Sequence, residues 1–501
     1  MKIKITKPKG MITKRAGKAF LFHEVCKRFK KDGAHSSIIL GGFGMKRRPK
    51  MGLVLGMSLT LLLSACSGNN GGGAATNGAA ATPGSEPAAS AAPAETAAPE
   101  AAPPDLGGRV LKFAAWWDLK PAGNTASEKE RLAKIAEVEK KYNVKIEFVN
   151  VPFEEYMPKF TATVLTGEPF ADIMQMEYKS ALPAALKGQL LKVDEFTSPE
   201  DDINQEKKLM VRTPAIAGQE YGFDNPGMAG SGIHYNRDLF KKLGLPDLQE
   251  LYASGQWNWD KFLEIAKQAT KDTDNDGKTD TYGFSGWSID IARNFVAANG
   301  GAFVDPENKA EGFTNPNTIE AVEFVNKLYN VENVVKNKTG DRMNYEEFNT
   351  FKDGDVAMFP APIWAVNSEL PFDFGVVPFP VGPHGSDKFT FADSGSAAKF
   401  IPKGVKDPQL VYKIYEETFD IAQTEDFPGQ EWLEGQYNHE EDIMMMKDNI
   451  NGKGQIVLED AYPDYPTGKF LTDILVNSQS VTASAQKYKP EAEASIGKLG
   501  N

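Results

Sequence analysis

The chain has 501 residues, with 56 Lys or Arg, 68 Asp or Glu and a formal net charge of −12 at pH 7. The first 50 residues hold 15 of the basic and 2 of the acidic residues, so the rest of the chain carries 41 basic and 66 acidic residues, a net charge of −25. A protein this acidic repels nucleic acid and anionic lipid, which argues against nucleic-acid binding and against membrane attachment through a basic surface.

Residues 45–66, MKRRPKMGLVLGMSLTLLLSAC, have the organisation of an export signal. Four basic residues lead into an apolar run over 51–63, which is too short to span a bilayer but has the length of a signal h-region. The run ends in LSAC, which resembles a bacterial lipobox in which the thiol of Cys66 accepts a diacylglycerol before cleavage. A buried apolar helix followed by a chance cysteine is the alternative. We predict lipidation at Cys66.

The stretch before this signal is basic and has no sustained helical or strand period. We therefore predict Met45 as the true first residue and treat 1–65 as an N-terminal extension plus signal peptide, outside the fold. Residues 66–106 contain the lipidated cysteine and a tether rich in Gly, Ala, Pro and Ser, which cannot bury a core. We expect a lipid-anchored protein on the outer face of the cytoplasmic membrane, of the Gram-positive type. Cys26 lies in the discarded part, so no disulfide is expected.

The folded part begins with an alternation of strand and helix patterns. A buried strand is predicted over 109–116, followed by a helix that a capping box from Ser127 to Glu130 opens and that ends near Asn143. A second strand over 144–151 completes a βαβ unit, which implies a parallel sheet. The next predicted elements are a helix over 154–166, a strand over 171–176 and a short helix over 182–186.

Five segments, taken in their order along the chain, resemble the landmarks of family 1 extracellular solute-binding proteins, the maltose-binding-protein-like receptors of ABC importers for sugars and oligosaccharides. They are FEEYMPKFTATVLTGEPFADIMQM (153–176), YGFDNPGMAGSGIHYNRDLFKKLGL (221–245), WNWDKFLEIAKQAT (257–270), FKDGDVAMFPAPIW (351–364) and FGVVPFPVGP (374–383).

The resemblance implies an α/β fold of the periplasmic-binding-protein type (type II), with two lobes, several hinge crossings and a ligand cleft between the lobes. On this chain, lobe 1 would take 107–228 and 377–425, and lobe 2 would take 229–376 and 426–501. A strand over 233–236 is expected to enter lobe 2, where helices start at Asn258 and at Pro316, the latter a proline at the first helical position. Another helix begins at Asp407-Pro408, in the second part of lobe 1.

Residues 272–280, DTDNDGKTD, match the calcium loop of an EF-hand. Its candidate ligands are Asp272, Asp274, Asp276, Lys278 and Asp280, with Gly277 at the sharp turn. Gly283 replaces the bidentate glutamate of position 12, so a complete EF-hand is excluded. We expect a structural Ca²⁺, with a solvated acidic turn as the alternative, and no catalytic cofactor.

Sugar recognition needs flat apolar faces against the ring and polar groups at its rim. Aromatic and acidic residues that follow predicted strands are candidates, because ligands bind at the carboxyl ends of strands in open α/β sheets. We favour Trp117 over Trp116, which can still face the core. Four predicted ligand-binding residues follow strands: Trp117, Asp118, Glu177 and Tyr178. The others are Asp224 and Asn225 on the segment that crosses between the lobes, Trp287 at a helix start in lobe 2, Tyr465, and Trp364, where the resemblance implies a sugar-stacking aromatic residue. Packing within the protein is the alternative role for each tryptophan.

The sequence contains neither H-E-x-x-H nor G-x-S-x-G, so no catalytic residue is assigned and no enzyme is expected. The favoured function is capture of a carbohydrate or oligosaccharide and its delivery to an ABC permease by a monomeric protein. Two alternatives remain. A surface lyase or glycosidase would break bonds in its ligand, and a ligand-sensing receptor domain would pass its closed state to a kinase.

Overall fold

The computed structural model describes residues 102–195, 219–223, 230–305, 308–366, 369–386, 388, 390–395, 397–422, 424–427 and 429–499. The predicted signal, Cys66 and most of the predicted tether lie outside these residues. Within the described ranges, no helix combines the length and the apolar character needed to cross a membrane.

The described strands are β1 (Arg109–Ala115), β2 (Val144–Asn150), β3 (Ile173–Glu177), β4 (Gly222–Phe223), β5 (Ser231–Asn236), β6 (Tyr282–Phe284), β7 (Val356–Pro362), β8 (Phe374–Val377), β9 (Phe391–Asp393), β10 (Ala397–Phe400) and β11 (Gly454–Ile456). The described α-helices are α2 (Ala126–Tyr142), α3 (Phe153–Leu165), α4 (Tyr178–Leu186), α6 (Arg237–Leu243), α7 (Leu248–Ala253), α8 (Trp259–Ala269), α9 (Ser288–Ala298), α10 (Pro316–Asn326), α11 (Pro408–Glu417), α12 (Gln430–Gln436), α13 (Glu440–Met445), α14 (Thr467–Leu475) and α15 (Val481–Gly497).

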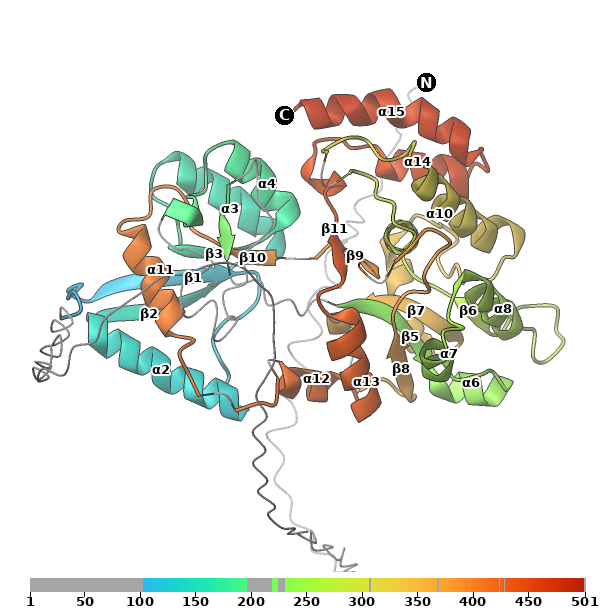
Figure 1. The fold of residues 1–501 in the computed structure, drawn as a ribbon, viewed down its shortest axis with the longest axis horizontal. Coiled ribbons are helices and arrows are strands. Elements are labelled where there is room, and N and C mark those ends of the chain that lie inside the picture. The colour runs from blue at the N-terminus through green and yellow to red at the C-terminus, as the bar shows by residue number, and fades with distance from the viewer. Residues whose placement is uncertain are drawn as a thin grey trace, which may run out of the picture. The chain divides into compact units, whose positions relative to one another are not determined.

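The first sheet has the strand order β2-β1-β3-β10-β4, in which β1 runs parallel to β2 and β3 while β10 runs antiparallel to its neighbours. Alternate residues of β1 enter two separate cores: Leu111 and Phe113 pack with residues of α2 and α11, and Ala114 packs with residues of α3 and α4. Figure 1 shows these helix pairs on opposite faces of the sheet. Only the last three residues of β1 are buried in succession, whereas Val110 and Lys112 near its start are exposed.

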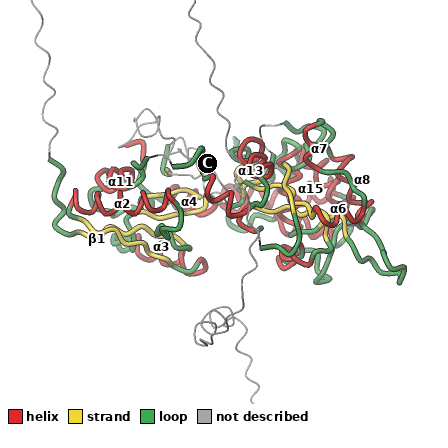
Figure 2. Tube along the Cα trace, turned by 90° about the horizontal axis from the view of Figure 1, so that it is seen from below, coloured by secondary structure: helices red, strands yellow, loops and turns green. Residues whose placement is uncertain are grey.

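The second sheet has the strand order β6-β7-β5-β8, with β6 parallel to β7 and β5 antiparallel to both of its neighbours. A separate pair of parallel strands joins β9 to β11. Figure 2 shows the strands in two groups, one beside α2, α3 and α4 and the other beside α6 and α8. Two mixed sheets covered by helices confirm the predicted α/β class.

Local signals in the sequence place most helix starts correctly. Asn258 caps α8 through its side chain, and Pro316 is the first residue of α10 after the capping Asn315. The predicted capping box is wrong by two residues, because Thr125 and Glu128 form it in place of Ser127 and Glu130. Both pairs fit the same four-residue pattern, so the sequence pattern alone does not choose between them.

The predicted short helix over 182–186 starts four residues earlier in the structure. α4 begins at Tyr178, directly after β3. The Tyr178 side chain is buried and meets Phe400 of β10 edge-on, with ring centroids 6.5 Å apart. Tertiary packing therefore extends the helix beyond the apolar run that marked it in the sequence.

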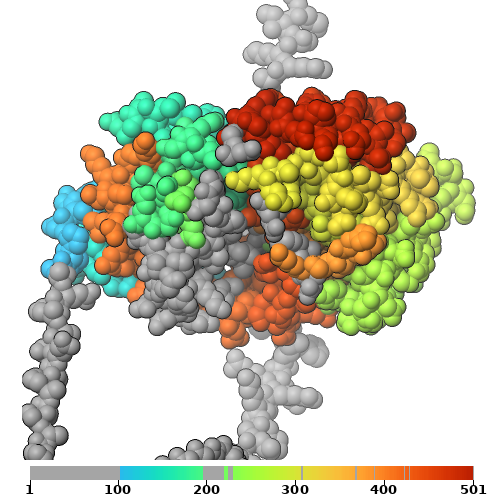
Figure 3. Space-filling view, turned by 45° about the horizontal axis from the view of Figure 1, so that its top comes forward, coloured from blue at the N-terminus to red at the C-terminus, as the bar shows by residue number. Residues whose placement is uncertain are grey.

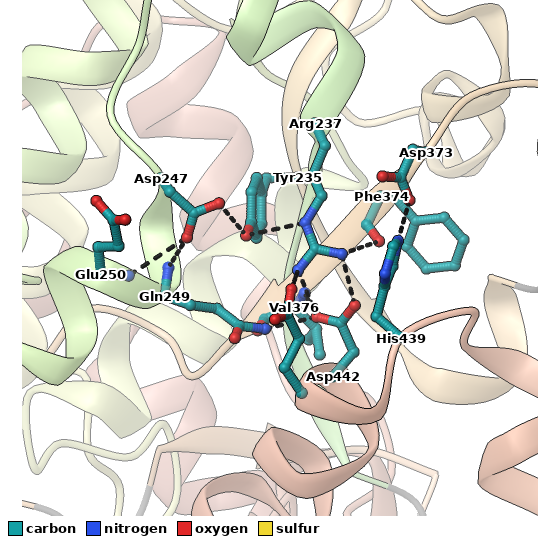
Figure 4. A network of polar contacts seen from close by, with 11 residues as sticks. Tyr235, Arg237, Asp247, Gln249, Glu250, Asp373, Phe374, Val376, His439 and Asp442 are labelled. Carbon is teal, nitrogen blue, oxygen red and sulfur yellow. Dashed lines mark hydrogen bonds and ion pairs between the residues drawn. The ribbon is translucent and has the colours of Figure 1, made fainter. Parts of the chain in front are cut away.

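A buried polar network ties α13 to the second sheet. Figure 4 shows Arg237 between Tyr235 and Asp442. The Arg237 guanidinium donates to the Asp442 carboxylate at 2.8 Å, and this carboxylate also accepts from the backbone N–H of Val376 at 3.0 Å and from Gln249 at 2.6 Å. Burial raises the pKa of Asp442 to about 6, while Arg237 and the Val376 N–H oppose the rise. Three protein groups thus donate to this buried carboxylate and satisfy it within the fold.

The C-terminal helix lies against the segment before α10. In Figure 3 the red C-terminal residues lie beside the yellow residues near position 310. Lys489 of α15 pairs with Glu311 at 3.2 Å, and Ser495 donates to the carbonyl of Pro463 at 2.6 Å. These contacts join the last helix to the part of the chain that carries the second sheet.

Candidate ligand-binding site

A cavity of about 470 Å³ lies where strands of both sheets end. From the first sheet, Trp116 follows β1, Phe153 follows β2 and Glu177 ends β3. The three strands are parallel, so their carboxyl ends meet at one edge of the sheet. The topology of the βαβ unit therefore delivers two aromatic side chains and one carboxylate to the same wall.

The second wall belongs to elements around the other sheet. Trp287 follows β6 and caps α9, Trp364 lies in a 3-10 helix directly after β7, and Tyr345 and Phe348 come from the 3-10 helix Tyr345–Asn349. β6 and β7 are parallel, which again brings the carboxyl ends of two strands together. The carboxyl ends of parallel strands therefore lie at the cavity in both sheets.

The aromatic side chains of the cavity hold one another in fixed orientations. Trp116 meets Phe153 edge-on at 5.5 Å, and Trp287 meets Tyr345 edge-on at 5.2 Å. The indole N–H of Trp287 donates to the carbonyl of Met343 at 3.2 Å. Trp364 remains 60% exposed, so a large apolar face stands beside the cavity with little protein covering it. Such faces suit a flat, partly apolar ligand such as a sugar ring.

An arginine and three carboxylates form one charged group at the cavity. Arg293 of α9 is buried and donates to Glu459 at 2.7 Å and to Asp460 at 2.6 Å, and its guanidinium lies 3.5 Å from Asp290. Glu459 is buried behind the cavity, whereas Asp290 and Asp460 line it. We call these four residues the Arg293 cluster.

Burial disturbs the ionisation of this cluster. It raises the pKa of Asp290, which Arg293 lowers in part, and it raises the pKa of Glu459 in the same way. Burial also opposes the charge of Arg293, but the carboxylates around it hold its pKa above the ordinary value. Groups with disturbed pKa values in a cavity are typical of functional sites.

Three of the predicted ligand-binding residues line this cavity together. They are Glu177, Trp287 and Trp364, which come from distant parts of the chain. Glu177 also pairs with Lys179 at 3.0 Å, so a lysine stands at the same wall. Glu177 was predicted because it follows a strand, Trp287 because it starts a helix, and Trp364 because it ends the landmark segment 351–364.

Other predicted residues lie elsewhere. Trp117 is 42% exposed and packs edge-on against Trp116, and Asp118 is exposed and accepts from the N–H of Lys120. Tyr178 is buried in the core of the first sheet. Tyr465 donates to the carbonyl of Phe303 at 2.6 Å and borders a different surface pocket. The other two predictions, Asp224 and Asn225, lie outside the described residues.

Several lining residues were not predicted from the sequence. Trp116 and Phe153 obey the same strand-end rule but were left out. Tyr345 and Phe348 lie between predicted elements, and the Arg293 cluster joins residues more than 160 positions apart, so no local pattern marks it. The unpredicted lining residues are Trp116, Phe153, Lys179, Ser231, Asp290, Arg293, Asn294, Tyr345, Phe348, Pro360, Pro362, Ala392, Asp393, Ser394, Gly395 and Asp460.

The predicted calcium loop is exposed and lies apart from the cavity. Carboxylate oxygens of Asp272, Asp274 and Asp276 lie within 4.8 Å of one another, which suits a hard cation. Asp280 accepts instead from the N–H and hydroxyl of Thr273, at 2.7 and 2.6 Å. The ammonium of Lys278 lies 3.3 Å from Asp276.

The structure explains why the loop lacks the last ligand of an EF-hand. A Cβ atom at Gly283 would lie 2.2 Å from the carbonyl oxygen of Ala266, so a glutamate has no room there. Gly277 has φ +84°, the left-handed conformation that the sharp turn requires. Three carboxylates therefore lie close together in this loop, and position 283 supplies no further one.

The structure resembles solved solute-binding proteins. An ABC substrate-binding protein from Listeria monocytogenes in complex with cycloalternan has 16% identity and a TM-score of 0.54, covering 78% of this chain and 99% of that one. The maltose/maltodextrin-binding domain of Bdellovibrio bacteriovorus bound to maltotriose has 16% identity and a TM-score of 0.51, covering 77% and 99%. A Mycobacterium tuberculosis protein in complex with glycerophosphocholine has 18% identity and a TM-score of 0.53, covering 78% and 99%.

These likenesses establish the two-lobe binding-protein fold. No curated protein matches the sequence. The model of the family of bacterial extracellular solute-binding proteins matches residues 122–416, which is more than half of the chain. Members of this family bind their ligands and are not enzymes. The chain belongs to the bacterial extracellular solute-binding proteins, the ligand-binding components of ABC transporters.

Proposed function

We propose that this protein captures a carbohydrate or oligosaccharide in the cavity between Trp116 and Trp364 and delivers it to an ABC permease. The observation that carries the proposal is the composition of the two walls. Among the described residues, six aromatic side chains line the cavity, and carboxylate and amide groups stand among them: Trp116, Phe153, Trp287, Tyr345, Phe348 and Trp364, with Glu177, Asp290 and Asn294. Aromatic faces with polar groups at their rim are what a sugar ring requires.

The volume and the origin of the walls support the same proposal. About 470 Å³ is ample for a small sugar and falls within the usual range of ligand cavities. Each wall comes from a different sheet, so a ligand that contacts both walls stabilises the arrangement in which they lie close. The permease would then recognise that ligand-stabilised arrangement. Solved proteins of this fold carry cycloalternan and maltotriose, which agrees with an oligosaccharide.

A ligand screen tests the proposal. The protein is heated with single mono- and oligosaccharides, peptides and polyamines, and every compound that raises the melting temperature is titrated by calorimetry. The proposal expects at least one sugar to bind with one site per chain. Binding of peptides alone, or of no sugar in the screen, would reject it. Incubation of the bound sugar followed by product analysis separates capture from the lyase or glycosidase alternative.

We further propose that Cys66 carries a lipid and that residues 66–106 tether the binding domain to the outer face of the cytoplasmic membrane. The LSAC sequence after the apolar run supports this, as does the tether composition. Expression of the precursor in a bacterial host, followed by mass spectrometry of the N-terminal peptide, tests it. A diacylglycerol on Cys66 is expected, and an unmodified thiol in the membrane-exported protein would contradict it.

We also propose that the loop formed by Asp272, Asp274 and Asp276 binds Ca²⁺ as a structural ion. Its carboxylates converge and Gly277 supplies the required turn. The ion would hold the loop between α8 and β6 and would take no part in ligand binding.

A further inference from the structure

The charges around the cavity are unbalanced. Among the described lining residues, four are acidic and two are basic: Glu177, Asp290, Asp393 and Asp460 against Lys179 and Arg293. Glu459 adds another carboxylate directly behind the wall, at 2.7 Å from Arg293. Carboxylates accept from the hydroxyls of a neutral sugar, but they bind a positively charged donor more tightly.

Both cations among the described lining residues already contact carboxylates of the protein. Lys179 lies 3.0 Å from Glu177, and Arg293 lies 2.7 Å from Glu459 and 2.6 Å from Asp460. An anionic ligand such as a uronate would therefore compete with these pairs and meet a net negative wall. The charge pattern disfavours it.

Asp290 and Asp460 are the carboxylates best placed to meet a positive group. Both share Arg293 with Glu459, so one guanidinium serves three carboxylates. Both are only half-buried, with side-chain exposures of 24% and 36%, and both face the cavity. Asp290 lies three residues after Trp287, in the first turn of α9. The rings of Trp287 and its neighbour Tyr345 offer faces that attract a cation.

We propose that the cavity accepts a carbohydrate that carries a protonated amine, with Asp290 and Asp460 as the partners of its ammonium group. The inference rests on the proposed sugar-binding function and narrows its ligand class. The ammonium would supply the positive charge that the Arg293 cluster lacks, and the aromatic walls would hold the sugar rings. Charge-assisted hydrogen bonds in a partly buried site give the amine its advantage over a hydroxyl.

Three trisaccharides with the same β-1,4 linkage test this proposal by calorimetry, below the pKa of the sugar amine. They are the glucosamine trimer, its fully N-acetylated counterpart and cellotriose. The glucosamine trimer is expected to bind at least about tenfold more tightly than the other two, because one charge-assisted hydrogen bond accounts for that factor. Equal or tighter binding of cellotriose or of the N-acetylated trimer would overturn the inference and leave the proposed function standing.

Substitutions test whether Asp290 and Asp460 cause the preference for the amine. Asp290→Asn and Asp460→Asn keep the side-chain shape and remove the charge, and each is expected to reduce the preference for the amine to within about twofold. Asp464→Asn is the matched control, because Asp464 is exposed and paired with Lys498 away from the cavity, and it should keep the preference. A preference unchanged in both cavity variants would also overturn the inference. If none of the three trisaccharides and no other sugar in the screen binds, the proposed function itself fails.

Discussion

Arg237, which is half-buried, and Arg293, which is buried, contact different numbers of carboxylates. Arg237 meets one fully buried carboxylate, Asp442, whose remaining hydrogen bonds come from Val376 and Gln249, and one exposed carboxylate, Glu441. Arg293 meets three carboxylates, and two of these face the cavity. The first arrangement is complete within the protein, whereas the second leaves an excess of negative charge beside open space. We therefore expect the contacts of Arg237 to serve the stability of the fold and the Arg293 cluster to serve ligand binding.

The largest expected effect is on the free energy of unfolding, when the contact between Arg237 and Asp442 is broken. Arg237→Met removes the cation and leaves the Asp442 carboxylate buried among neutral groups. We expect the free energy of unfolding at pH 7 to fall by about 3–5 kcal/mol, the usual cost of breaking a buried pair. Denaturant unfolding measures it. Arg109→Met is the control, since Arg109 pairs with Asp172 nearer the surface and should cost about 1 kcal/mol or less.

The stability cost of Arg237→Met should also depend on pH. Burial already raises the pKa of Asp442 from 3.8 to about 6, and Arg237 opposes that rise, so its loss raises this pKa further. A raised pKa in the fold means that the stability contribution is present below the unfolded value and is lost as pH rises through the folded value. The cost of Arg237→Met should therefore shrink as the pH falls from the higher pKa of the variant toward 6, where Asp442 of the original protein also becomes protonated. A cost that grows on acidification would contradict this.

At the cavity, the largest expected effect is on affinity. Trp364→Ala removes an aromatic face that is 60% exposed in the protein, so the melting temperature should change little. The affinity for the bound sugar should fall by about 1–3 kcal/mol through lost stacking and burial. Calorimetry measures this loss. Trp432→Ala is the matched control, because Trp432 is also exposed and does not line the cavity.

A substitution in the Arg293 cluster should not lower the free energy of unfolding, in contrast to Arg237→Met. Asp290→Asn removes one of three carboxylates around Arg293, and burial already raises the pKa of Asp290. We expect the free energy of unfolding to stay equal or to rise by up to about 1 kcal/mol at pH 7, because functional sites commonly sacrifice stability. A loss above about 1 kcal/mol would show that Asp290 is needed for the fold.

The smallest expected effect is at the acidic loop. Extracellular calcium sites bind with dissociation constants of about 0.1–1 mM, so 1 mM Ca²⁺ should raise the unfolding free energy by about 0.4–1.4 kcal/mol. Asp272→Ala should abolish this gain. An equal gain in the variant, or no gain in the original protein, would remove the calcium proposal.

The sequence predicts the fold better than the site, for physical reasons. Helix starts at Asn258 and Pro316 depend on local cap chemistry, which the sequence displays directly. The choice of Trp117 over Trp116 depends on which of two neighbouring side chains points to the cavity, and one residue of strand length reverses that answer. The contacts of Arg293 with Glu459 and Asp460 arise only in the folded chain, so no pattern within α9 predicts them.

Native mass spectrometry with the sugar identified by the screen tests the central claim most directly. The account predicts one intact sugar per chain after prolonged incubation, and loss of the complex when Trp287 and Trp364 are both replaced by alanine. A shortened sugar, or a complex that survives the double substitution unchanged, would contradict capture of an unaltered ligand in this cavity.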